Sequence, residues 1–128
     1  MSDSSLIALI RKLYGARGNV NVFKSLLADD LEYDIAEGFP NGGVHHGIDA
    51  TVHNFFPFMA DFDEFYAEGD EYFESGDHVI ALGRYVGVTK KGRRMQSRFA
   101  HFWTLRDGKV GRLQQTADTL LIAQALGK

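Results

Sequence analysis

The sequence predicts a single α+β domain that covers residues 1–128. Three observations support this class. Apolar residues recur at helical spacing in the first half of the chain and again at its end. Strand-like runs separated by short turn signals fill the region between them. With 45% hydrophobic residues, a chain of 128 residues is near the usual size for one core, and two domains would each be too small to bury much.

Two helices are expected at the start of the fold. Residues 4–17 place their apolar side chains on one side and their basic side chains opposite, and a serine at the start can cap this helix. Gly18 and Asn19 end it. A shorter helix follows over residues 20–27 and stops at an acidic turn.

A short strand, a loop and a third helix come next. Residues 31–36 are extended, and the sequence EGFPNGG that follows is rich in residues that favour turns, so it is expected to be a loop. Residues 47–59 show helical spacing, with Asp49 near the N-terminus, where the helix dipole favours a carboxylate. Pro57 predicts a kink or an early end.

The second half predicts an antiparallel meander. Turn signals at residues 75–77, 91–92 and 107–108 separate strands expected at 63–74, 78–89, 94–105 and 109–116. A helix is expected over residues 119–126.

The third strand of this meander is apolar on both faces. Phe99 and Trp103 share one face, and Ala100 and Phe102 share the other. Three helices can cover only one face of so large a sheet. We therefore expect a symmetric partner subunit to cover the outer face, which makes the protein a homodimer.

Composition excludes several classes of function. The chain has no cysteine, so a thiol nucleophile, a disulfide and a cysteine metal site are excluded. It has neither a basic segment before its first apolar stretch nor a long apolar run, so we expect a cytoplasmic protein with no membrane partner.

The charged residues are unevenly distributed. Acids gather in residues 61–77, and lysine and arginine gather in residues 84–112. Since neighbouring antiparallel strands would bring the two groups together as cross-strand pairs, and the net charge is −3, no nucleic-acid partner is expected. The histidines lack the tight spacing of a helical metal site, so we expect no metal and no cofactor.

Motifs along nearly the whole chain carry a family resemblance: EGFP at 37–40, GIDA at 47–50, DGKV at 107–110, and Asp118–Thr119 before a short helix. With them the chain resembles the SnoaL-like branch of the nuclear transport factor two-like superfamily, which also contains ketosteroid isomerase. The resemblance implies a cone-shaped, strongly curved antiparallel sheet wrapped around N-terminal helices, with an enclosed apolar pocket. It also implies pairing of subunits through the outer face of the sheet.

Asp118 is the first candidate for catalysis. The resemblance implies that polyketide cyclases of this branch place their acid/base aspartate at this distance after the DGKV turn. Proton abstraction next to a carbonyl needs a base whose pKa is raised toward working pH, and an apolar pocket raises a carboxyl pKa by desolvation. The alternative is that Asp118 is an ordinary N-cap of the terminal helix.

Asp34 is the second candidate, because the resemblance places it where ketosteroid isomerases carry their catalytic aspartate. Those enzymes pair the base with an oxyanion hole formed by a tyrosine and a protonated aspartate. Here Arg11 and Ala100 stand at these two positions, so steroid isomerisation of that type is not expected. The alternative is that Asp34 is a solvated or salt-bridged acid on a strand.

Strand alternation indicates which other residues could line the pocket. If Asp118 faces inward, then Thr116, Phe102 and Thr104 face inward as well, and His101 faces outward. A β-bulge would reverse this order and bring His101 inside.

Three further ligand contacts are expected from the first half of the chain. Tyr14 is expected to be a hydrogen-bond donor if the local geometry differs from the alignment with ketosteroid isomerase. His46 or its neighbour His45 is expected at the pocket mouth. Phe55 is expected to line the wall.

Two functional hypotheses remain open at this point. In one, Asp118, with or without Asp34, transfers protons on a polyketide-like or other enolisable hydrophobic substrate without a cofactor, as an isomerase or cyclase. In the other, the protein binds a small hydrophobic or aromatic ligand or serves as a dimerisation module, and Asp118 only caps a helix.

Overall fold

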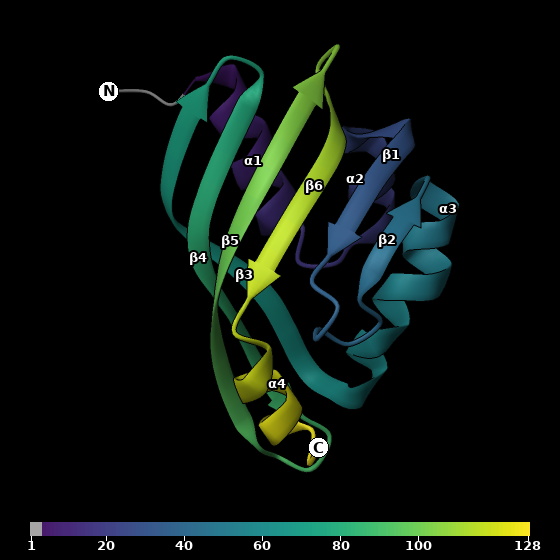
Figure 1. Ribbon diagram of the computed structural model, residues 1–128, viewed down its shortest axis with the longest axis vertical. Helices are drawn as coiled ribbons and strands as arrows, with labels where there is room; N and C mark the ends of the chain where they lie inside the picture. The colour runs from purple at the N-terminus through teal and green to yellow at the C-terminus, as the bar shows by residue number, and fades with distance from the viewer. Residues whose placement is uncertain (1–3) are drawn as a thin grey trace.

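The structure, a computed structural model, describes residues 4–128. A single curved sheet forms most of the molecule, and helices cover its concave side and one of its ends (Figure 1). The prediction of an α+β fold, in which a curved sheet wraps around N-terminal helices, is confirmed.

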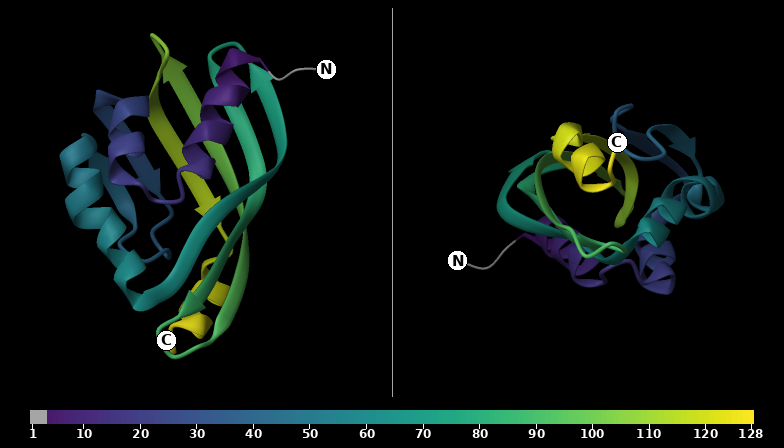
Figure 2. Two further views of the ribbon diagram at one scale, coloured as in Figure 1. Left: turned by 180° about the vertical axis from the view of Figure 1, so that it is seen from behind. Right: turned by 90° about the horizontal axis from the view of Figure 1, so that it is seen from below.

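The two N-terminal helices, α1 (Ser5–Gly15) and α2 (Val20–Leu26), lie on the same side of the sheet (Figure 2, left). The side chains of Ser4 and Asn19 cap them by accepting hydrogen bonds from backbone N–H groups of the first turn. Ile10 on α1 is fully buried against the sheet. The amphipathic pattern thus places the apolar side of α1 on the core, as predicted.

The sheet has six strands in the order β2-β1-β6-β5-β4-β3. Their bounds are β1 Leu27–Ile35, β2 Gly43–His46, β3 Phe62–Ser75, β4 His78–Thr89, β5 Arg94–Arg106 and β6 Lys109–Ala117. The four strands of the predicted meander are present, and each boundary lies within a residue or so of its expected place.

Three features of the sheet differ from the prediction. Strand β1 begins at Leu27 and not at residue 31, so Asp29 and Asp30 belong to the strand and do not form the expected turn. The sheet is mixed, because β1 runs parallel to its neighbour β6. The segment that follows the EGFP turn also contains the short strand β2, which pairs antiparallel with β1. Its four residues, GVHH, are too few and too polar to show the alternation by which a strand is recognised.

The third helical segment changes type along its length. It begins as α3 (Ile48–Ala50), continues as a π-helical stretch η1 (Thr51–Phe55) and ends as a 3-10 helix η2 (Phe56–Asp61). Pro57 lies at the start of η2, and since proline has no N–H to donate, it fits the predicted end of regular helix there.

The terminal helix α4 (Thr119–Ala125) lies near the far end of β5, away from α1 (Figure 1). Ile122 is its fully buried residue. Seen from below, the strands curve around the interior, so that the sheet has the expected cone shape (Figure 2, right). No helix in the described part of the chain has the length and apolar character needed to span a membrane.

The uneven charges form cross-strand pairs on the sheet surface. Arg84 on β4 lies 3.2 Å from both Glu68 and Asp70 on β3, and Lys90 lies 3.1 Å from Asp63. These contacts agree with the expectation that the acidic and basic runs lie side by side in the sheet.

Candidate functional site

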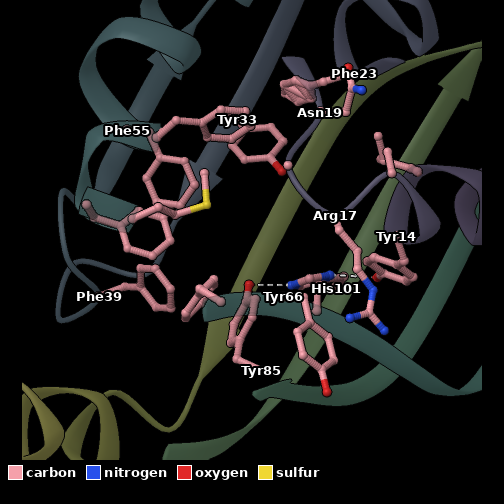
Figure 3. Close-up of a pocket in the computed structure, with 18 of the residues that line it drawn as sticks. Tyr14, Arg17, Asn19, Phe23, Tyr33, Phe39, Phe55, Tyr66, Tyr85 and His101 are labelled. Atoms are coloured by element: carbon pink, nitrogen blue, oxygen red, sulfur yellow. Dashed lines mark hydrogen bonds between the residues drawn. The ribbon is translucent and has the colours of Figure 1, made fainter. Parts of the chain in front are cut away.

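A cavity of about 110 Å³ lies between the N-terminal helices and the concave face of the sheet (Figure 3). Most of its wall is apolar or aromatic. The lining residues are Leu13, Tyr14, Ala16, Arg17, Gly18, Asn19, Phe23, Tyr33, Phe39, Phe55, Phe56, Phe58, Met59, Phe65, Tyr66, Ala67, Tyr85, His101 and Trp103.

The size of the cavity limits what it can hold. A buried apolar space of roughly 150 Å³ in another protein takes up one benzene molecule. A cavity of about 110 Å³ is of similar size, so without movement of the wall it fits a ligand portion of about one ring.

A hydrogen-bonded set of three side chains forms the polar part of the cavity. His101 Nδ1 lies 2.6 Å from the Tyr14 hydroxyl, and His101 Nε2 lies 2.7 Å from the Tyr85 hydroxyl. The ring of Phe99 stacks on His101 with centroids 3.8 Å apart, which holds the imidazole in its plane. The three polar side chains come from α1, β4 and β5, so only the folded chain brings them together.

Two further donors extend this set. Trp103 Nε1 donates to the Tyr14 hydroxyl at 3.0 Å, and Gln115 Nε2 donates to the Tyr85 hydroxyl at 2.6 Å. The Gln115 carbonyl oxygen accepts from the Ala36 backbone N–H at 3.1 Å, which fixes its orientation. We call Tyr14, Tyr85, His101, Trp103 and Gln115 the polar network.

Burial sets the protonation of this network. Desolvation lowers the pKa of His101 to about 3, so the imidazole is neutral near pH 7. Desolvation also raises the pKa of Tyr14, Tyr33 and Tyr85 above the usual tyrosine value, so these phenols keep their protons. The network is therefore neutral.

A count of protons shows what the network offers to a ligand. A neutral imidazole has one N–H and one lone pair, so His101 donates to one of its two tyrosines and accepts from the other. The tyrosine that accepts the hydrogen bond from His101 already accepts a second one, from Trp103 in the case of Tyr14 or from Gln115 in the case of Tyr85. Its own O–H has no acceptor within the network. Whichever ring nitrogen carries the proton, one phenol O–H remains available to the cavity.

Tyr33 adds a second available donor. Its side chain is only 8% exposed and lines the cavity, and its hydroxyl points into the space in Figure 3. It makes no hydrogen bond with any other residue that the structure describes. This hydroxyl is therefore available to donate to an acceptor on a ligand.

The expected orientation of β5 and β6 is wrong. Phe99, His101 and Trp103 are buried and face the interior, whereas Phe102 is 36% exposed on the outer face. The expectation assumed that Asp118 faces the cavity, which would place the even-numbered residues of β6 inside. On β6, however, the odd-numbered Leu113 is buried. Each residue of these two strands therefore lies on the face opposite to the expected one.

Neither candidate catalytic aspartate lines the cavity. Asp118 is exposed and caps α4, with its carboxylate 3.4 Å from the backbone N–H of Leu121. Asp34 lies on the outer face of β1, 3.8 Å from Arg112, which also pairs with Glu32. The expectation that these two carboxylates line the cavity is wrong.

Four of the seven expected ligand contacts also lie outside the cavity lining. Phe102, Thr104 and Thr116 belong to the outer face, where Thr104 contacts His78 at 3.1 Å, and His46 is exposed on β2. The other three, Tyr14, Phe55 and His101, are part of the cavity lining. Among the residues that the structure describes, no cluster of histidines and carboxylates could hold a metal ion.

Several residues of the cavity wall and of the polar network were missed at the level of the sequence. Tyr33 and Tyr85 of the wall and Gln115 of the network lie on three different strands and carry no local motif. The sequence did contain one signal of the inward face. Every second residue of one strand has a ring side chain, at Phe99, His101 and Trp103. Such a row is typical of an interior face.

The comparisons with known proteins agree with this fold. The model of the SnoaL-like domain family matches residues 11–113. The chain belongs to the SnoaL-like domain family. The earlier resemblance is thereby confirmed, and the SnoaL-like chain has the fold of the nuclear transport factor two-like superfamily. No curated protein matches its sequence.

Solved structures of the same fold cover nearly the whole SnoaL-like chain. One is a nuclear transport factor two-like protein of Burkholderia thailandensis, with 29% identity, a TM-score of 0.84 and coverage of 98% of both chains. TerC, crystallised with polyporic acid, has 24% identity and a TM-score of 0.88 over 98% of this chain and 100% of its own. IdmH of Streptomyces antibioticus, a candidate polyketide cyclase, has 18% identity and a TM-score of 0.81 over 98% and 100%.

The cap observed at Asp118 predicts the outcome of two substitutions. Asp118→Asn keeps a good capping side chain, so the free energy of unfolding and the binding of ligands should both stay unchanged. Asp118→Ala should lower the free energy of unfolding by about 1 kcal/mol, again without changing ligand affinity. Chemical denaturation and a ligand titration measure the two quantities. A loss of binding in Asp118→Asn with normal stability would contradict the cap.

Proposed function

We propose that this protein binds a small hydrophobic or aromatic molecule in the cavity under α1 and α2. A hydrogen-bond acceptor of the molecule, such as a carbonyl oxygen, would lie against the polar network. The observation that carries the proposal is the available phenol O–H of Tyr14 or Tyr85 inside a wall of aromatic side chains. Apolar walls with a few placed polar groups are typical of small-molecule sites.

Binding is better supported than proton transfer by an aspartate. No carboxylate is among the described residues that line the cavity. The network can donate to a carbonyl and would stabilise negative charge there, but a base must also accept the substrate's proton. The low pKa of His101 makes it a weak base. We therefore favour the ligand-binding hypothesis over the isomerase or cyclase hypothesis.

Two relatives support the class of molecule. TerC was crystallised with polyporic acid, and IdmH is a candidate polyketide cyclase. A polyketide-like compound combines rings with carbonyl oxygens, which suits a cavity that has an aromatic wall and a donor.

Trp103 makes the proposal testable, because it is the sole tryptophan of the chain and lines the cavity. Titration with acetophenone, which has one ring and one carbonyl, should change Trp103 fluorescence and saturate. Ala67→Leu, which fills the cavity from β3, should abolish the response. Ala100→Leu on the outer face is the matched control and should keep it. A response that is equal in both variants, or no saturable response in the native protein, would refute the proposed function.

We also propose that a second copy of this chain covers the outer face of the sheet. Phe73, Leu82 and Phe102 are 52%, 38% and 36% exposed there. Phe73 and Phe102 flank Ile80 in register, so the apolar side chains form a row across three strands. Light scattering should show a dimer for the native protein and for Phe102→Leu, and a monomer for Phe102→Lys. A monomeric native protein at micromolar concentration would disprove this arrangement.

A further inference from the structure

Arg17 is the sole charged side chain among the described residues that line the cavity. It lies in the turn between α1 and α2, where the backbone N–H of Arg17 donates to the carbonyl of Tyr14 at 3.2 Å. Figure 3 shows its guanidinium group beside Tyr14 and Tyr66, at the edge of the cavity. No aspartate or glutamate lines the same space to neutralise it.

The contacts of Arg17 leave its hydrogen-bond donors available. The guanidinium carbon lies 3.9 Å from the centre of the Tyr66 ring, so one face of the cation is stacked on the ring. The N–H groups of a guanidinium point outward in its plane and are not used by such stacking. No ion pair or side-chain hydrogen bond joins Arg17 to another described residue.

The other polar groups of the cavity are also donors. The polar network leaves one phenol O–H, and Tyr33 adds another. The side-chain oxygen of Asn19 already accepts from two backbone N–H groups as the cap of α2, so its amide NH₂ is the part left over. A ligand that satisfies this wall must present oxygen acceptors.

We infer that the cavity takes an aromatic carboxylate, whose ring lies in the aromatic wall and whose carboxylate pairs with Arg17. The inference rests on the proposed function and adds the charge of the ligand to it. A neutral ligand would cover the guanidinium and remove part of its water without replacing it. A carboxylate replaces that water with two charge-assisted hydrogen bonds in the geometry that a guanidinium favours.

The test compares benzoate with benzamide, which has the same shape and no charge. Both are titrated into the native protein by calorimetry and by Trp103 fluorescence. Because Arg17 is exposed at the edge of the cavity, water screens the pair, so benzoate should bind about threefold more tightly, which corresponds to roughly 0.6 kcal/mol. Added salt should reduce this preference.

Substitutions then assign the preference to Arg17. Arg17→Gln should make the two affinities equal by weakening benzoate alone, and Arg17→Lys should keep part of the preference because it retains the charge but not the fork. Arg11→Gln is the matched control, because Arg11 also stacks on a tyrosine, with 4.2 Å to the Tyr72 ring, but does not line the cavity. It should leave both affinities unchanged.

The outcomes separate the two proposals. Equal affinities in the native protein, or a benzoate preference that survives Arg17→Gln, would overturn the role of Arg17 and leave the proposed function intact. If neither probe nor acetophenone binds, the proposed function fails and this inference fails with it. Because the readout is a ratio of two affinities on one variant, a modest loss of stability in Arg17→Gln does not obscure it.

Discussion

Acidification should destabilise this protein by several kcal/mol through His101 alone. Burial lowers the pKa of His101 to about 3 in the folded protein, whereas an unfolded histidine has its ordinary pKa near 6.5. Below pH 6.5 the unfolded chain therefore binds a proton that the folded chain does not. Stability is complete above pH 6.5, falls as the pH decreases, and levels off below about pH 3.

The size of this effect follows from the difference between the two pKa values. Each unit corresponds to about 1.4 kcal/mol, so the full loss is about 4 to 5 kcal/mol, and about 2 to 3 kcal/mol of it appears by pH 4.5. The surroundings of His101 explain why the charged form is excluded. Tyr14 and Tyr85 bond its two nitrogens, and the rings of Phe99 and Trp103 contact it on two further sides.

His101→Gln provides the control. Glutamine offers one donor and one acceptor group, as a neutral imidazole does, and does not titrate in this range. The free energy of unfolding of both proteins is measured by denaturation between pH 7 and pH 4. The difference between them should shrink as the pH falls, with a slope that approaches one proton. Parallel curves would show that His101 titrates in the folded protein as it does in the unfolded chain.

The double substitution Tyr14→Phe with Tyr85→Phe should remove the recognition of a carbonyl group almost completely, whereas either single substitution should not. In Tyr14→Phe, His101 can donate to Tyr85, whose own O–H is then available to the ligand. In Tyr85→Phe, His101 can donate to Tyr14 with the same result. Only the double variant lacks a network hydroxyl, so the two losses are not additive.

Acetophenone and its hydrocarbon analogue α-methylstyrene measure this effect, because they differ in the carbonyl oxygen. Their affinity ratio should be about tenfold in the native protein, as expected for one hydrogen bond of roughly 1.4 kcal/mol. It should stay near tenfold in each single variant, because one network hydroxyl remains available, and should approach one in the double variant. Phe65→Leu, a change in the apolar wall, should lower both affinities together and keep the ratio. A ratio that is unchanged in the double variant would exclude the two hydroxyls as the carbonyl site.

The same hydroxyls contribute to stability. Loss of both leaves the indole N–H of Trp103 and the amide of Gln115 buried without partners, which costs about 1 to 3 kcal/mol for each group. The binding ratio is therefore measured at a temperature where the double variant is folded, as judged by its near-ultraviolet spectrum.

The sequence by itself determined most of the elements and their order. Helical spacing located α1 and α2, and the turn residues between strands located β3 to β6, because these signals depend on neighbours within one turn or one hairpin. Family motifs then fixed the curved sheet and the presence of an interior pocket. These features are local or are repeated along the whole chain, so a single sequence carries them.

Only the tertiary structure decided which residues face that pocket. Side chains alternate between the two faces of a strand, and this alternation is equally regular whichever face points inward. The incorrect assumption that Asp118 faces the cavity therefore reversed the assignment of β5 and β6. The polar network joins side chains from α1, β4, β5 and β6, which no short motif can specify. The inward side of each strand is set by how the whole sheet curves around α1, and the chemistry of this protein depends on that choice.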